Sequence, residues 1–238
     1  MPLGVEILNI NYNNYVSLLG TAHFTNRSLS EAYEAVKKLK PTDLAIELDM
    51  QRFQFLNQRC ISCPEREHCV GRCEFVGATD ALGNVNANIW LIDMSEREIE
   101  ERIHRLVPSP LRLWRFSMVR FPFLPVDNGD DEVWLWEKGH KDEVLERHAR
   151  RLEALRMRAP HVWRVLIDER NALMATRLAW IVTQKLNKEE VKVLALTGAA
   201  HVDGIKELLG YPLRLGEELR RLGLKFTFPQ LIRRVNVN

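Results

Sequence analysis

Short apolar runs and one helical repeat organise the first fifty residues. Val16–Leu19 and Leu44–Ile46 are apolar runs of strand length. Between them, apolar residues recur at helical spacing until Pro41, where proline ends the helix. Ser28 and Glu31 have the spacing of a capping box, which predicts the start of that helix. The order strand, helix, strand is typical of parallel neighbours in an α/β sheet.

The remaining periodicity extends this fold along the chain. We expect further strands over 89–92 and 191–196, and helices over 53–57, 74–82, 95–106, 142–157 and 162–186. Residues 108–129, rich in Pro, Trp, Phe and Arg, are expected to form a packed irregular connection, with a lid as the alternative. The prediction is a single α/β domain over residues 1–238. It has a central mixed, largely parallel sheet flanked by helices, with long helices in the C-terminal half.

Composition narrows the class of protein. Hydrophobic residues make up 46% and charged residues 28% of the chain, which is typical of a globular protein and excludes disorder. The formal net charge of +2 gives no general attraction to nucleic acid or membranes. No apolar stretch has the length of a membrane span, and the first residues do not resemble a secretory signal. We therefore expect a cytoplasmic protein without nucleic-acid binding or membrane insertion, and leave a homo-oligomer open.

Two Gly-x-x-His turns each follow a predicted strand, one near each end of the chain. Gly20 precedes His23, and Gly198 precedes His201, each by three residues. Glycine permits a sharp turn and a close backbone approach at such a corner. Glu47 follows its own strand directly, so we expect these side chains to converge where the carboxyl ends of parallel strands meet. Two neutral imidazoles and a carboxylate suit a divalent metal such as Mn or Co, with positions left for water and substrate.

These segments resemble the TraB/PrgY family, which is related to the Tiki proteases and more distantly to ChaN-like proteins and erythromycin esterases. The resemblance rests on four segments in order, namely Leu18–His23, Leu44–Arg52, Ile167–Asn171 and Gly198–His201. It implies the architecture of a metal-dependent hydrolase, with peptide-bond cleavage in the Tiki branch. It also implies that the two histidines and Glu47 form the metal-binding or catalytic set.

The same resemblance implies roles for two arginines. Arg52 and Arg170 match family arginines that orient carboxylates or clamp a substrate carboxylate. For Arg52, a supporting ion pair with Glu47, about one turn earlier, and a solvated helix position are alternatives. Asn171 belongs to the same matched helix. Where family members carry Asp-Arg-Asp after the third strand, this chain keeps only Asp93, and we expect it and Asp49 to orient the metal ligands.

All four cysteines fall within residues 59–74, which we interpret as a small metal-binding insertion. Cys60, Cys63, Cys69 and Cys73 predict a zinc ion held by four thiolates, with a [4Fe-4S] cluster as the alternative. The spacing locally resembles the four-cysteine stretch of SPASM-type domains. Free thiols or a disulfide pair are further alternatives. Because the segment follows the Glu47 motif, a position over the active site, with a role in regulation or substrate recognition, is a hypothesis.

Three functions are compatible with these features. The first is a metal-dependent hydrolase of the peptidase type, acting on a peptide or small molecule at the Gly-x-x-His site. The second is a non-catalytic regulatory protein that binds a peptide or ligand and is stabilised by a metal in the cysteine loop. The third is a metal-sensing module in which the cysteine loop is the switch. The helical His-Glu-x-x-His pattern of common metalloproteases is absent from the sequence.

Overall fold

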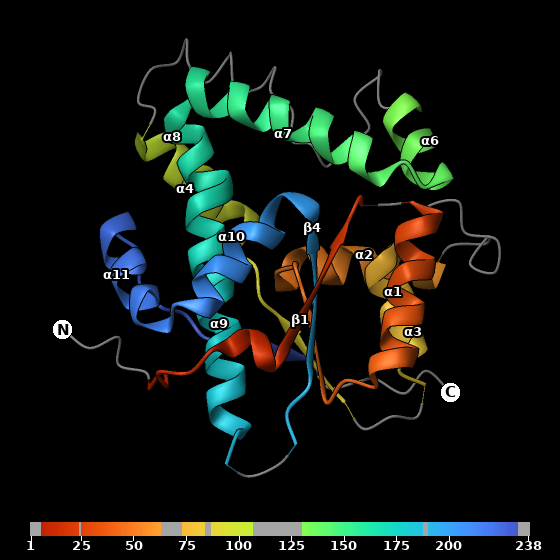
Figure 1. The fold of residues 1–238 in the computed structure, drawn as a ribbon, viewed down its shortest axis with the longest axis horizontal. Helices are drawn as coiled ribbons and strands as arrows, with labels where there is room; N and C mark the ends of the chain where they lie inside the picture. The colour runs from red at the N-terminus through yellow and green to blue at the C-terminus, as the bar shows by residue number, and fades with distance from the viewer. Residues whose placement is uncertain are drawn as a thin grey trace.

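The computed structural model describes residues 6–23, 25–62, 73–83, 87–106, 130–187 and 190–232, which form one sheet covered by helices (Figure 1). Its strands are β1 (Val16–Thr21), β2 (Asp43–Ile46), β3 (Asn88–Leu91), β4 (Val193–Gly198) and β5 (Gln230–Ile232). The earlier helices are η1 (Tyr12–Asn14), α1 (Asn26–Leu39), α2 (Met50–Ser62), α3 (Glu74–Ala81) and α4 (Glu96–Leu106). The later helices are α6 (Asp130–Lys138), α7 (Lys141–Arg158), α8 (Pro160–Trp163), the π-helix η3 (Arg164–Glu169), α9 (Arg170–Lys185), α10 (Ala199–Gly210) and α11 (Pro212–Leu222).

The strand order in the sheet is β1-β4-β2-β3-β5. The first four run parallel to their neighbours, and β5 pairs antiparallel with β3, which confirms the predicted mixed, largely parallel α/β fold. The pairing register places Gly20 beside Thr197 and Thr21 beside Gly198. The two Gly-x-x-His turns therefore leave the sheet side by side. On the other flank of β4, strand β2 ends immediately before Glu47.

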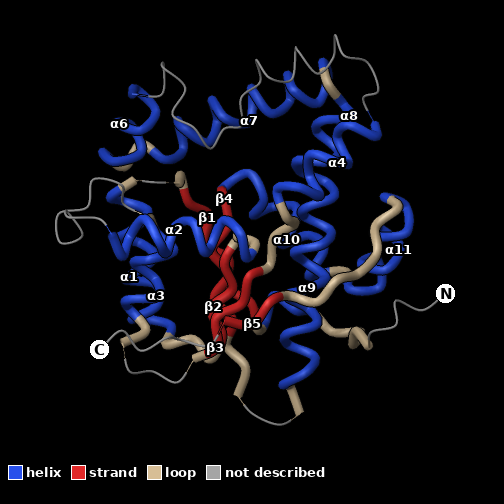
Figure 2. Tube along the Cα trace, turned by 180° about the vertical axis from the view of Figure 1, so that it is seen from behind, coloured by secondary structure: helices blue, strands red, loops and turns tan. Residues whose placement is uncertain are grey.

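Two apolar clusters fill the space between the sheet and its helices. Leu44 and Ile46 of β2 pack into one cluster with α1 and α3. Ala45, between them, points into the other cluster, with α9, α10 and α11. Figures 1 and 2 show these two groups of helices on opposite sides of the sheet. Because successive residues of β2 enter different clusters, the strand is buried on both faces, which explains its uninterrupted apolar run.

The long helices predicted for the C-terminal half are present. α7 runs across the end of the molecule at the top of Figure 1, and α8, η3 and α9 follow one another without a gap. The π-helical turn Arg164–Glu169 ends directly before Arg170. A π turn adds a residue to a helical turn and often occurs at functional sites. Here it leads directly into the first residues of α9, Arg170 and Asn171.

The start of α1 differs from the predicted capping box. The helix begins at Asn26, and its cap is Thr25, whose Oγ1 accepts a hydrogen bond from the Ser28 amide at 3.1 Å. Ser28 is instead buried, and its hydroxyl group bonds both backbone groups of Ala22, at 2.8 Å to the oxygen and 3.1 Å to the nitrogen. The prediction at Ser28 was wrong because the side chain serves the turn that carries His23. The sequence pattern also missed α6, α11 and β5.

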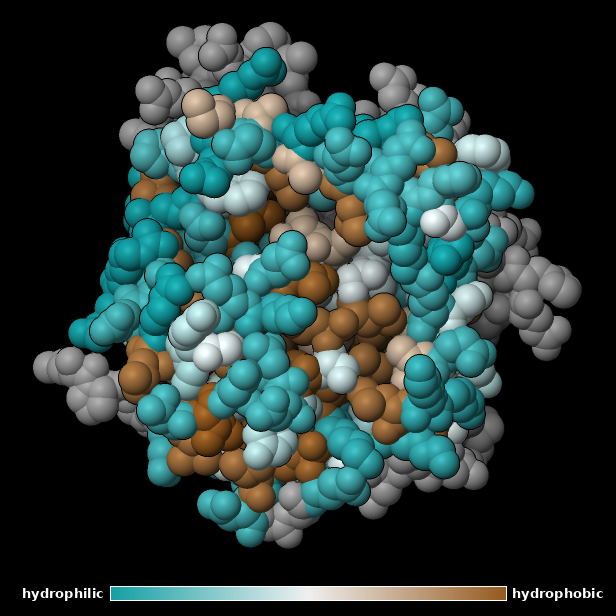
Figure 3. All heavy atoms as spheres, viewed as in Figure 1, coloured by the Kyte–Doolittle hydropathy of each residue, from teal (hydrophilic) through white to brown (hydrophobic). Residues whose placement is uncertain are grey.

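The surface is uneven in polarity. Figure 3 shows hydrophilic side chains over the region where α7 runs and hydrophobic residues in the middle of the same face. β1 lies in this middle region in Figure 1, and its Leu18 and Leu19 are partly buried.

Among the residues that the structure describes, no helix combines the length and apolarity needed to cross a membrane. The segment 108–129 lies outside the described residues.

Candidate functional site

Three predicted site residues meet at Gly198, the last residue of β4. A β-carbon added to Gly198 would lie 3.1 Å from His23 Nε2, 3.6 Å from Glu47 Oε2 and 3.8 Å from His201 Cδ2. The Gly198 amide donates a hydrogen bond to Glu47 Oε2 at 2.6 Å. The predicted convergence of the two histidines with the glutamate is therefore found in the structure. Any side chain at position 198 would fill the space between them.

Gly20 has a related reason to be glycine, although it lies within β1 and forms no turn there. A β-carbon at Gly20 would lie 2.8 Å from Val202 Cγ2 and 3.1 Å from Ala199 Cα. The start of α10 thus packs directly against the end of β1. This close approach, part of what the sequence predicted for the glycine, brings the two histidine turns together.

Glu47 is fully buried and carries several charged contacts. Arg170 Nη2 donates a hydrogen bond to Glu47 Oε1, and His201 Nε2 lies 3.5 Å from the same oxygen. Burial acts to raise the pKa of Glu47, but the charged groups around it, with the Arg170 guanidinium in direct contact, outweigh burial and hold the pKa below its ordinary value. Glu47 is therefore a carboxylate at neutral pH, with one oxygen shared between a guanidinium and an imidazole.

His201 is buried, with 3% of its surface exposed, and is a neutral imidazole at pH 7. Its Nδ1 lies 2.7 Å from Asn171 Oδ1, so its Nε2 faces Glu47. Burial lowers the pKa of His201 to about 4, and the nearby Glu47 carboxylate opposes this only in part. Asn171 is held close to α10, since a β-carbon at Gly204 would overlap Asn171 Nδ2. The sequence predicted a supporting role for Asn171 but did not single out Gly204.

His23 has a different partner, which sequence reasoning missed. Its Nδ1 lies 2.5 Å from Glu74 Oε1, and the same oxygen accepts a hydrogen bond from Thr21 Oγ1 at 3.0 Å. Burial acts to lower the pKa of His23, but the hydrogen bond and the charge of Glu74 outweigh it and raise the pKa. Glu74 opens α3, where a glutamate is ordinary because of the helix dipole. Nothing in the sequence therefore distinguished it.

Asp93 connects the two predicted arginines. Arg170 donates to it through Nε at 2.9 Å and Nη2 at 2.8 Å, and Arg52 donates through Nη2 at 2.8 Å. Arg52 Nε also bonds Asp49 Oδ2 at 2.6 Å. Burial acts to raise the pKa of Asp93, but the two guanidinium groups hold it far below its usual range. Arg52 thus forms supporting ion pairs, but with Asp49 and Asp93 rather than with the expected Glu47. Asp93 is joined to Glu47 through Arg170.

The donor atoms at this site suit a divalent ion in type and direction. Each histidine has a polar partner at Nδ1, which leaves Nε2 on the inner side, as in metal-bound histidines. Two tetrahedral ligands about 2.1 Å from one ion are about 3.4 Å apart, close to the 3.5 Å between His201 Nε2 and Glu47 Oε1. As the side chains stand, however, no three His, Cys, Asp or Glu residues of the described part form a metal-holding group. The donor set fits a metal, whereas the present arrangement is not a closed coordination shell.

The predicted cysteine site lies mostly outside the described residues. This applies to Cys63, Cys69 and the side chain of Cys60, whose backbone belongs to α2. Cys73 is buried and occupies the N-cap position of α3, directly before Glu74. The cysteine segment therefore ends next to the residue that contacts His23. Its metal remains a prediction.

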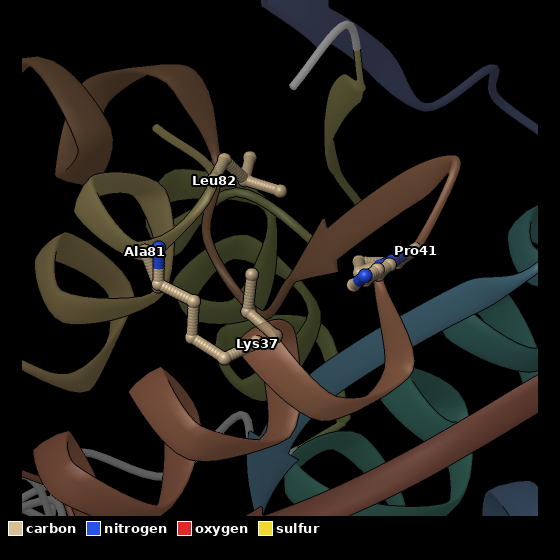
Figure 4. Close-up of a pocket in the computed structure, with 6 residues that line it drawn as sticks. Lys37, Pro41, Ala81 and Leu82 are labelled. Carbon is tan, nitrogen blue, oxygen red and sulfur yellow. The ribbon is translucent and has the colours of Figure 1, made fainter. Parts of the chain in front are cut away.

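A separate pocket lies at the other end of the sheet. It has a volume of about 260 Å³ and is lined by residues from the ends of α1 and α3 and from the loop before β2, including Lys37, Pro41, Ala81 and Leu82 (Figure 4). The lining contains none of the predicted site residues. Because β2 begins at Asp43 and ends before Glu47, the pocket is near the amino ends of the strands and the candidate site near their carboxyl ends.

Comparisons with known proteins give one distant relative. No protein-family model matches the chain. An uncharacterized protein from Methanocaldococcus jannaschii is 23% identical over 224 residues, an alignment that covers 82% of this chain. The chain spans about half of that relative, 53% of its length. This similarity assigns neither a family nor an activity.

Proposed function

We propose that this chain is a hydrolase that activates water between His23, Glu47 and His201, with a divalent metal as part of the site. The observation that carries the proposal is the meeting of these three side chains around Gly198, at the carboxyl ends of parallel strands. Ligands and substrates of open α/β sheets bind at this edge. The substrate class that follows from the chemistry is a carbonyl compound, such as a peptide or another amide or ester.

Each residue of the site has a distinct role in such a reaction. His23 Nε2 accepts a proton from the attacking water and later returns it to the leaving group, while Glu74 stabilises the charged ring. Glu47 stays ionised and orients water or metal, because Arg170 holds it in place. His201 stays neutral and contributes its Nε2. A divalent ion held by Glu47 and His201 Nε2 would supply Lewis acidity and lower the pKa of bound water, and the lone pair of His23 Nε2 would stay available for the proton.

The family resemblance enters this proposal on the same residues. The four motif segments that resemble the TraB/PrgY family contribute His23, Glu47, Arg52, Arg170, Asn171 and His201, all of which belong to the contacts described above. The shared placement supports a family relationship as part of the proposal. The preference for peptide substrates follows from that relationship. A substrate screen tests this preference first.

The test is a hydrolysis screen on purified protein with a matched pair of variants. Fluorogenic peptides and simple aryl esters are incubated with protein after chelation and after addition of Mn, Co or Zn. Glu47→Gln keeps the shape of the side chain but removes the charge, and we expect it to abolish turnover. Asp203→Asn, on the exposed side of α10, changes the same charge near His201 and should leave turnover unaltered. Equal hydrolysis by both variants would refute the proposal.

A non-catalytic ligand-binding role is the alternative, and one observation favours it. Glu47 already accepts hydrogen bonds from Arg170 and the Gly198 amide, so each carboxylate oxygen is held by a protein donor. A carboxylate held in this way suits a rigid binding pocket. Peptide binding that persists in Glu47→Gln, in a protein without turnover, would identify this role.

A further inference from the structure

The two histidines look equivalent in the sequence, but their partners differ chemically. His201 Nδ1 faces the amide of Asn171, whereas His23 Nδ1 faces the carboxylate of Glu74. An amide can present either its oxygen or its nitrogen to a ring nitrogen and so accepts both tautomers. An ionised carboxylate only accepts hydrogen bonds, so its partner nitrogen must carry the proton. The difference fixes the tautomer of His23 but not that of His201.

We propose that Glu74 is the positioning residue of this site, which fixes His23 in the Nδ1–H tautomer and directs the lone pair of Nε2 into the space beside Gly198. The geometry on both sides of the ring supports this. Nδ1 lies 2.5 Å from Glu74 Oε1, and Nε2 lies 3.1 Å from the position of an added Gly198 β-carbon. The lone pair is what either a general base or a metal ligand requires at this point.

Glu74 is itself held firmly enough to serve this purpose. Its side chain is completely buried and accepts a second hydrogen bond from Thr21, the last residue of β1. α3, which begins at Glu74, packs tightly on α1, since a β-carbon at Gly77 would lie 2.9 Å from Leu29 Cγ. α1 follows the His23 turn in the chain. Carboxylate and imidazole are thus attached to two elements that pack closely against each other.

The direct test is the protonation state of the ring nitrogens in ¹⁵N-histidine-labelled, metal-free protein. Long-range ¹H–¹⁵N spectra at mildly alkaline pH distinguish the two tautomers of a neutral ring, and the loss of one signal set in His23→Gln assigns His23. We expect Nδ1–H in the wild type and a mixture or the opposite tautomer in Glu74→Gln. Glu34→Gln, an exposed change of the same kind on α1, should leave the spectrum unaltered.

An Nε2–H tautomer for wild-type His23, or an unaltered tautomer in folded Glu74→Gln, would overturn the inference. The wild-type spectrum decides the matter even where Glu74→Gln does not fold. The catalytic consequence rests on the proposed function. Once turnover is measurable, Glu74→Gln should lower kcat by about 10–100-fold with little change in KM. The expected tautomer in a protein without hydrolytic activity would support the role of Glu74 and refute only the proposed function.

Discussion

At the residue scale, the site depends on a glycine as much as on its charged groups. The space beside Gly198 is bounded by two imidazoles and a carboxylate, all within 3.8 Å of an added β-carbon. Glu47 also requires the close approach of the Gly198 amide, at 2.6 Å. The position therefore combines a hydrogen-bond donor with room for a water, metal or substrate atom. A methyl group there competes for that room.

Gly198→Ala is expected to damage the site more than the fold. The added carbon meets His23 Nε2 at 3.1 Å, and overpacking of this kind costs about 1–3 kcal/mol. Urea unfolding measures this loss of stability. We also expect the variant to lose metal or substrate binding. The matched control is Gly210→Ala at the end of α10, where the added carbon meets only the tip of Asn13, at 3.3 Å. Wild-type binding in Gly198→Ala would show that the space is not used.

The two histidines also predict opposite dependences of stability on pH. The folded pKa of His201 is about 4, below the usual 6.5, so between these values the unfolded chain binds more protons than the folded one. The stabilisation is complete above pH 6.5 and is lost as the pH falls toward 4, by at most about 3 kcal/mol. The raised pKa of His23 has the opposite effect on the free energy of unfolding. Its stabilising contribution is complete below pH 6.5 and is lost as the pH rises through the raised pKa.

Urea unfolding in metal-free buffer across the acidic window measures the contribution of His201. His201→Gln cannot be protonated, so its free energy of unfolding should fall less steeply than that of the wild type between pH 6.5 and 4. Buried carboxylates with lowered pKa values, such as Glu47 and Glu74, add to the slope near the acidic end of this window in both proteins. Parallel slopes in the two proteins would contradict the assignment of a neutral, buried His201.

At the scale of elements, α6 supports the turn that carries His23. Trp136 is completely buried and donates a hydrogen bond from Nε1 to Ser28 Oγ at 3.1 Å. Ser28 in turn bonds both backbone groups of Ala22, the residue before His23. Glu137, next to Trp136, accepts hydrogen bonds from the first amides of α1, those of Asn26 and Arg27. One helix thus holds the turn and also caps the helix that follows it.

Trp136→Phe is predicted to weaken this support without emptying the core. Phenylalanine keeps most of the apolar packing but cannot donate to Ser28, and one lost hydrogen bond costs about 1 kcal/mol. Urea unfolding gives the cost, and slower turnover or weaker metal binding would report the looser turn. Trp134→Phe is the control, because Trp134 lies on the same helix with 55% of its surface exposed. Equal effects of the two variants would argue against the Ser28 contact.

Periodicity in the sequence predicted the helices and strands that bury a regular face. It did not predict those whose position depends on contacts with residues far away in the chain. β1, α1 and β2 were predicted because their apolar spacing reflects burial within the sheet. α6 was missed because Trp136 and Glu137 act on α1, more than a hundred residues earlier. The cap at Thr25 was misplaced because Ser28 has a partner in the preceding turn. Such contacts leave no periodic signal.

At the scale of the whole molecule, the strand order explains why part of the site was predictable. Parallel neighbours place the carboxyl ends of β1, β4 and β2 together, so strand-end residues such as His23, Glu47 and His201 had to meet. The residues that contact these side chains and shift their pKa values come from outside the strands. Glu74 begins a helix, and Arg170 follows a π-helical turn. Their directions depend on helix packing, which spacing in the sequence does not encode.

Cys73, the one predicted cysteine ligand whose side chain the structure describes, lies next to the histidine site, and metal analysis can separate the two predicted metal sites. Cys73 directly precedes Glu74, which contacts His23, so the cysteine segment and the histidine site share one end of α3. Elemental analysis compares the wild type with Cys60→Ser/Cys63→Ser and with His23→Gln/His201→Gln. We expect each double variant to lose one metal and keep the other, because the ligand sets share no residue.

Iron with visible absorption that bleaches on reduction would favour the [4Fe-4S] alternative over zinc in the cysteine site. Equal metal content in all three proteins would contradict both sites, and loss of both metals in the cysteine variant alone would show that the histidine site depends on an ordered α3.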